Sequence, residues 1–226
     1  MRLFEIITQT DDFIIIHKPH GISVHKDDND VGLTQLLAEQ LGVPQVWLVH
    51  RLDKVTSGLL LLALNERAAA DLSALFAEHK IQKTYLALSN FKPKKKQGLI
   101  IGDMEKSRRG AWKLTQSLNQ PAITRFYSMS CEPNLRLFLL QPQTGKTHQL
   151  RVAMKSLGSP ILGDALYAGK TENIDRTYLH AYRLVFEYKG KTYDVRLLPH
   201  QIKNGGVFFE RMSVIQQISQ IDSKKT

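Results

Sequence analysis

Short apolar runs bounded by polar or turn-forming residues recur along the chain. The first, Phe13–Ile16, is rich in β-branched residues and predicts a buried strand. The longest fully apolar run, Leu59–Leu64, has six residues and predicts a second buried strand. The other predicted strands are Val46–Val49, Lys83–Ser89, Pro121–Cys131, Leu135–Leu140, Tyr178–Tyr188 and Lys191–Leu197.

Three further segments carry their apolar residues at helical spacing. Leu33–Leu41 is expected to end at Gly42, whereas Asn65–Lys80 begins with an asparagine suited to an N-cap. Thr144–Leu157 opens with a glycine turn and then becomes helical. Some strands follow one another as hairpins, as at Lys189-Gly190, and others alternate with helices. This pattern predicts an α+β fold with a mixed, mainly antiparallel sheet and flanking helices.

The composition is that of an ordinary folded protein. The chain has 226 residues, of which 42% are hydrophobic and 23% charged. No apolar run approaches the roughly 18 residues that span a bilayer, and the N-terminus has no secretory pattern. The single cysteine, Cys131, excludes an intrachain disulfide and a cysteine-rich zinc site. We therefore expect a cytoplasmic globular protein that forms one domain over residues 1–226.

The net charge of +10 is concentrated in one segment. Lys80–Lys113, hereafter the basic segment, holds ten basic and two acidic residues, a surplus of eight charges in 34 residues. Such a segment is either a solvated surface whose lysines aid solubility or a surface that binds a polyanion along its phosphates. Composition alone leaves both interpretations open.

The most unusual polar segment is His50–Gly58, with the sequence HRLDKVTSG, which separates two predicted strands. Its acid, Asp53, is flanked by Arg51 and Lys54, and nearby cations favour the ionised form that a nucleophile needs. The alternative is an aspartate that caps a turn, and spacing alone favours this second interpretation.

A second polar segment, Thr144–Arg151, has the sequence TGKTHQLR. It places polar side chains at the opening of a predicted helix, where it is either an anion-binding loop or an ordinary N-terminal capping network. The Walker, GxGxxG, GxSxG and HExxH patterns are absent from the chain, so these motifs indicate no nucleotide, serine-hydrolase or zinc chemistry.

Both polar segments closely resemble signature motifs of the RluA-type RNA pseudouridine synthases. Further similarity extends in the same order over most of the chain, although Lys146 stands where the family commonly has arginine. The resembling segments are Asp12–His25, His50–Ala63, Lys83–Leu88, Thr144–Val152, Leu162–Gly169 and Leu179–Phe186.

The resemblance implies a pseudouridine synthase fold with a central cleft, no cofactor and no metal, and we expect a monomer. Many members of the family carry a separate N-terminal RNA-binding domain, but the resembling segments begin at Asp12 here, so a catalytic domain without that extra domain is expected. The expected partner is structured RNA, a stem-loop of rRNA or tRNA, in which specific uridines are isomerised to pseudouridine. The implied catalytic residues are Asp53, Tyr85 and Arg151. Asp53 would start the reaction, Arg151 would hold its charge in place and Tyr85 would stack on the uracil. The residues implied to bind substrate are His50, Arg51, Leu52, Thr56, Gly58, Lys83, Lys146, Thr147, His148, Gln149 and Leu150.

Because the target base must leave the RNA stack, Arg51 is expected to fill the vacated space. Two other functions compete with an isomerase. One is a catalytically silent RNA-binding module with the same fold. The other is a nuclease that uses His50 and His148, although the sequence has no metal or paired-base pattern to support it.

Overall fold

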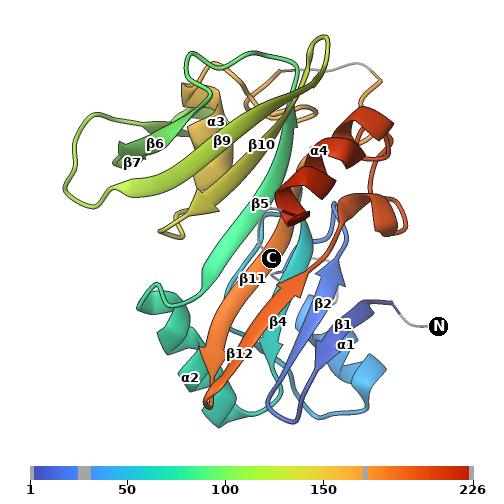
Figure 1. Cartoon of the computed structure of the whole chain (residues 1–226). Helices are drawn as coiled ribbons and strands as arrows, with labels where there is room; N and C mark the ends of the chain where they lie inside the picture. Colours follow the sequence, from blue (N-terminus) through green and yellow to red (C-terminus); the bar gives the residue numbers. More distant parts are fainter. Residues whose placement is uncertain (1–2, 25–31, 170–172, 224–226) are drawn as a thin grey trace. The chain divides into compact units, whose positions relative to one another are not determined.

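The computed structural model describes residues 3–24, 32–169 and 173–223 (Figure 1). The chain divides into two compact units. The first unit comprises Met1–Gln82 and Ala181–Leu197, and the second comprises Lys83–His180 and Leu198–Thr226. Each unit contains antiparallel strands and helices, which confirms the predicted α+β class.

The first unit is built on a sheet with the strand order β1-β2-β4-β11, in which β3 pairs with β4 and β12 with β11. The pairs β1 with β2, β2 with β4, and β3 with β4 are antiparallel. The strands are β1 (Glu5–Gln9), β2 (Phe13–Lys18), β3 (Trp47–Leu48), β4 (Ser57–Ala63), β11 (Leu179–Tyr188) and β12 (Lys191–Arg196).

The core of this unit follows from its two most apolar strands. Every residue of β2 and β4 is buried, as expected for strands that the sheet and the packed helices cover completely. Phe13 packs edge-on against the rings of Phe186, Tyr188 and Tyr193. The predicted tight turn between β11 and β12 is confirmed, since Lys189-Gly190 has positive φ at both residues.

Two helices accompany this sheet, and the end of the first and the beginning of the second are as predicted. Helix α1 (Leu33–Leu41) ends at Gly42, which adopts the left-handed conformation. Helix α2 (Glu66–Ala77) is capped by Asn65, whose side chain accepts a hydrogen bond from the amide of Ala68. Helix α2 ends at Ala77, three residues before the predicted Lys80, and His79 already has a positive φ of 57°.

The second unit contains the antiparallel strand order β5-β10-β9-β6 and a separate two-stranded sheet, β7–β8. The turn between β9 and β10 includes Asn134 at positive φ, in agreement with the predicted turn. The strands are β5 (Gln82–Ser89), β6 (Gln97–Gly102), β7 (Met104–Lys106), β8 (Trp112–Leu114), β9 (Ala122–Glu132) and β10 (Leu135–Pro142). The helices are α3 (Gln149–Ser156), α4 (Met212–Ser223) and the 3-10 turns η1 (Arg108–Gly110) and η2 (Pro199–Gln201).

The sequence pattern missed several elements: β1, β6, β7, β8 and α4. Helix α4 contacts β9 and buries Val214 and Ile218, which are four residues apart. None of the helices in the described parts of the chain is long and apolar enough to cross a membrane.

Candidate active site

Asp53 lies in a turn that follows β3 in the first unit. Its backbone carbonyl accepts a hydrogen bond from the amide of Thr56 at 3.0 Å, and its side chain is half-buried. The preceding Arg51 is exposed, whereas Leu52, Thr56 and Gly58 are buried. The segment therefore presents a cation and a carboxylate from a turn whose apolar and small residues are anchored in the core.

The turn is held by the Lys-Pro-x-Gly sequence at the end of β2. The Lys54 carbonyl accepts hydrogen bonds from the Gly21 amide at 2.7 Å and from the Lys18 ammonium at 3.4 Å. Lys18 is fully buried and also donates to the carbonyls of Pro19 and Ile22. A buried ammonium that donates to backbone carbonyls is compensated for its lost hydration, so it can fix two loops at once.

His50 supports the other end of the same segment. Its Nε2 accepts a hydrogen bond from the Leu61 amide at 2.9 Å, and its ring stacks on Phe76 with centroids 4.3 Å apart. The backbone of β3 pairs with β4 as far as Leu48, which lies opposite Leu62. After Leu48 the chain leaves the sheet, and the His50 imidazole takes the place of a backbone carbonyl as the acceptor for the neighbouring Leu61 amide of β4. These contacts give His50 a supporting position beneath the Asp53 turn.

In the second unit, Tyr85 lies on β5 opposite Leu140 of β10 and is buried. Lys83 is two residues earlier and therefore on the same face of the strand. Its ammonium donates to the Thr144 carbonyl at 3.3 Å, and burial lowers its pKa. Strand β5 thus places the desolvated amine of Lys83 beside the loop that precedes α3 and carries Tyr85 on the same face.

Gln149 shapes that loop. Its Oε1 accepts from the Thr144 hydroxyl at 2.7 Å and from the Lys146 amide at 3.0 Å, while its Nε2 donates to the Ile123 carbonyl and the Thr124 hydroxyl. This network ties the loop to β9. The N-cap residue of α3, His148, makes no side-chain capping hydrogen bond, so the capping interpretation of the segment is wrong in this form. Along the rest of the segment, Lys146 is exposed, Thr147 and His148 are half-buried, and Leu150 is buried.

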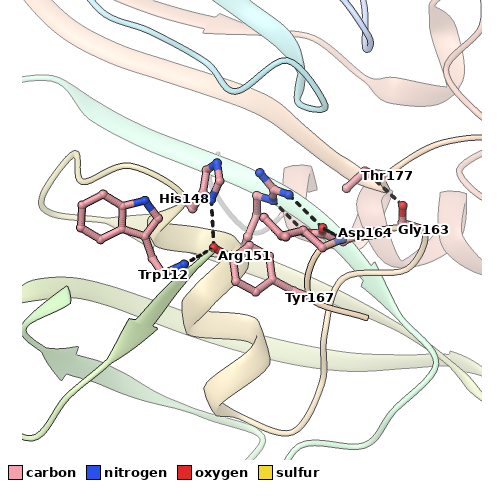
Figure 2. A network of polar contacts seen from close by, with 8 residues as sticks. Trp112, His148, Arg151, Gly163, Asp164, Tyr167 and Thr177 are labelled. Carbon is pink, nitrogen blue, oxygen red and sulfur yellow. Dashed lines mark hydrogen bonds and ion pairs between the residues drawn. The ribbon is translucent and has the colours of Figure 1, made fainter. Parts of the chain in front are cut away.

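Arg151 points from the first turn of α3 into a buried polar network (Figure 2). Its Nε donates to Asp164 Oδ2 at 2.7 Å and its Nη2 to Asp164 Oδ1 at 2.9 Å, with side chains 7% and 1% exposed. The guanidinium carbon also lies 5.0 Å from the ring centroid of Tyr167. A bidentate pair together with a cation–π contact fixes the plane of the guanidinium.

The loop that carries Asp164 is itself tightly anchored. The Thr177 hydroxyl donates to the Gly163 carbonyl at 3.0 Å, and the Leu166 amide donates to Asp164 Oδ1 at 3.1 Å. Gly163 has φ +76°, and a Cβ there would lie 2.0 Å from the Arg176 carbonyl oxygen. Only glycine fits this approach, so the backbone sets where the Asp164 carboxylate lies.

The expected site residues thus lie in two groups, one in each unit. The first unit holds the segment around Asp53, and the second holds Lys83, Tyr85 and Thr144–Arg151. No role was predicted for Asp164 or Tyr167, although both belong to the segment LGDALYAG, which resembles the family. Among the described residues, no group of three or more His, Cys, Asp or Glu side chains could hold a metal ion.

Comparison with known proteins identifies the class of protein. The sequence model of the family described as "RNA pseudouridylate synthase" matches residues 12–156. An "Uncharacterized RNA pseudouridine synthase" of Haemophilus influenzae is 68% identical over 214 residues, covering 95% of this chain and 94% of that protein. A "Ribosomal large subunit pseudouridine synthase C" of Rickettsia bellii is 36% identical over 81% of this chain and 64% of its own.

Solved structures agree on the fold. The human RNA pseudouridylate synthase domain containing 4 protein matches with a TM-score of 0.75 and 22% identity, over 95% of this chain and 93% of that one. The human domain containing 1 protein matches with a TM-score of 0.74. The sequence comparisons define an enzyme class, the RNA-modifying isomerases. Within this class, the chain belongs to the RNA pseudouridine synthase family.

Proposed function

We propose that the chain isomerises specific uridines of structured rRNA or tRNA to pseudouridine. In this reaction, Asp53 initiates cleavage of the bond between ribose and the uracil nitrogen. The base turns within the site and rejoins the ribose through carbon 5, so atoms balance without redox change or hydrolysis. Arg151 stabilises the charge of Asp53, and Tyr85 stacks on the uracil. The whole chain acts as one catalytic domain.

The rigid setting of Arg151 is the observation that carries this proposal. Asp164 and Tyr167 hold a buried guanidinium in one orientation, as a site needs when it stabilises charge with groups fixed before the reaction starts. The relatives are named for both RNA classes. One is a ribosomal large subunit enzyme, and a Pectobacterium carotovorum relative of 34% identity is a "tRNA pseudouridine synthase C".

The test is the Asp53→Asn variant, which keeps the size of the side chain and removes its charge. We expect the variant to bind unmodified RNA as the wild type does and to form no pseudouridine. Asp71→Asn is the matched control, because it removes an exposed carboxylate from α2 of the same unit. Full activity of Asp53→Asn would refute the assignment. Pseudouridine mapping in RNA from a deletion strain identifies the target uridine, and an unchanged map would favour a silent RNA-binding module.

The basic segment supplies a second test. Lys94–Lys96 are exposed, and their replacement by alanine should weaken RNA binding and flatten its dependence on salt. Each lost phosphate contact reduces the slope of log affinity against log salt by about 0.7–0.9. The control removes the same charge by replacing Lys189, Lys191 and Lys203, which lie outside the basic segment. Equal salt slopes for the wild type and the Lys94–Lys96 variant would show that these lysines serve solubility.

A further inference from the structure

The two-stranded sheet β7–β8 forms a basic hairpin, Met104–Leu114, which we call the β7–β8 arm. Arg108 and Arg109 are exposed at its tip, and Arg109 adopts a positive φ in the turn. All of the arm except Leu114 lies within the basic segment, so the arm belongs to the surface that the proposed function assigns to RNA.

Tyr167 joins this arm to the loop before α3. Its hydroxyl accepts a hydrogen bond from the backbone amide of Trp112, the first residue of β8, at 2.9 Å. The same oxygen lies 2.9 Å from Nδ1 of His148, which precedes α3 and adopts a positive φ of 56° (Figure 2). Tyr167 is only 6% exposed, and a buried phenol loses most when its hydrogen bonds are removed.

The ring of the same residue faces Arg151. The guanidinium carbon lies 5.0 Å from the ring centroid, while Asp164 occupies the Nε and Nη2 edge. One side chain therefore contacts the arm through its hydroxyl and the arginine through its ring. A displacement of Trp112 would therefore move the Tyr167 hydroxyl, and with it the ring that packs against the Arg151 guanidinium.

We propose that Tyr167 is a positioning residue that couples the β7–β8 arm to Arg151, with its hydroxyl fixing the arm and its ring fixing the guanidinium. The inference rests on the proposed function, in which the arm contacts RNA and Arg151 serves the reaction. The proposal assigns a different effect to each part of the Tyr167 side chain. Loss of the hydroxyl affects RNA binding, and loss of the ring affects the chemical step.

The experiment compares Tyr167→Phe with Tyr167→Leu. The substrate is an unmodified transcript of large-subunit rRNA or tRNA, whichever the wild type modifies, and kcat, KM and the Kd for RNA are measured. Phenylalanine keeps the ring beneath Arg151 and removes the hydroxyl contacts with the Trp112 amide and His148 Nδ1. We therefore expect KM and Kd to rise by at least roughly fivefold, the effect of one neutral hydrogen bond, with kcat unchanged. Leucine also removes the cation–π contact, so kcat should fall by roughly tenfold as well.

A double-mutant cycle distinguishes coupling through the arm from a general structural role. In an Arg108→Ala/Arg109→Ala background, the arm has lost the charges that contact RNA. Tyr167→Phe should therefore raise KM much less than it does in the wild type, because only the contact of the hydroxyl with His148 is still lost. Tyr127→Phe, a half-buried tyrosine of β9 outside this network, is the control and should match the wild type in every parameter. Melting temperatures of all variants report any general loss of stability.

Two results would overturn the inference. In one, Tyr167→Phe equals an active wild type in KM and Kd. In the other, its effect on KM is undiminished in the Arg108→Ala/Arg109→Ala background. Failure of the proposed function has a different signature, because the wild type itself would then form no pseudouridine in either RNA.

Discussion

Replacing Gly58 by alanine should destabilise the first unit strongly, because this glycine lies against the backbone of a neighbouring strand. Gly58 has φ +115°, and a Cβ built on it would lie 2.3 Å from the Ala181 carbonyl oxygen and 2.5 Å from the Ala181 nitrogen. Both atoms belong to the backbone of β11, so no side-chain rotation can relieve the contact. The two strands would have to separate.

The expected magnitude has two parts. A side chain at such a positive φ costs about 1–2 kcal/mol. An extra carbon in a closely packed site costs about 1–3 kcal/mol, and the rigid backbone contact favours the upper end of this range. Together they give about 4–5 kcal/mol. Since 1 kcal/mol shifts the melting temperature of a domain of this size by about 2–4 °C, the expected decrease is roughly 10–20 °C.

Gly42→Ala is the matched control for this prediction. Gly42 also has a positive φ, +67°, but a Cβ there would meet no atom within 4 Å. It therefore carries the conformational cost alone, about 1–2 kcal/mol. Urea unfolding followed by circular dichroism gives the free energy of unfolding of both variants. Equal destabilisation of the two would refute the argument that contact with Ala181 requires glycine at position 58.

Three further predictions concern stability and reactivity. Asp164→Ala leaves the buried Arg151 guanidinium without its carboxylate and should cost about 3–5 kcal/mol in urea unfolding; a cost below 1 kcal/mol would contradict this. Hydrogen bonds from Arg183 lower the pKa of Asp194 to about 2, although burial opposes them. Asp194→Asn should therefore lose about 1 kcal/mol or less at pH 7. The difference in the free energy of unfolding between the wild type and this variant should shrink as the pH falls below 3.8 and through 2, because the Asp194 carboxylate is then protonated and loses its stabilising charge. A difference that stays constant over this pH range would argue against a stabilising Arg183–Asp194 ion pair. Burial raises the pKa of Cys131 to about 11, so iodoacetamide at pH 8 should modify it much faster in denaturant than in the folded protein; equal rates would contradict the burial.

The strands and helices that the sequence predicts are those whose signal is local. Phe13–Ile16 and Leu59–Leu64 are apolar enough to be buried in a sheet, and Asn65 caps α2 by a contact only three residues away. The edge strand β6 pairs with β9 and leaves Leu99 and Ile101 exposed. Its short apolar run, Leu99–Ile101 between two glycines, is a local strand signal that could have predicted it. Helix α4 did carry a signal, the helical spacing of Val214 and Ile218, which could have predicted it.

The candidate site could be predicted in its residues but not in their partners. The motif Thr144–Arg151 identifies the arginine, yet its carboxylate partner, Asp164, lies 13 residues further along a loop. The position of that carboxylate depends on the approach of Gly163 to the Arg176 carbonyl, a tertiary contact with no local pattern. Tyr167 was missed for the same reason, because its contacts with β8 and α3 form only in the folded unit.

These contacts also change how the motifs should be interpreted. Lys18, Gly21, His50 and Gln149 belong to segments that resemble the family, yet the hydrogen bonds described here hold the loops around the site in shape. A variant of such a residue would lose activity by releasing the turn that carries Asp53 or the loop before α3. Loss of activity alone therefore cannot assign a chemical role within these motifs. A variant supports such a role only when its melting temperature and RNA affinity match the wild type while kcat falls, which is the result expected for Asp53→Asn.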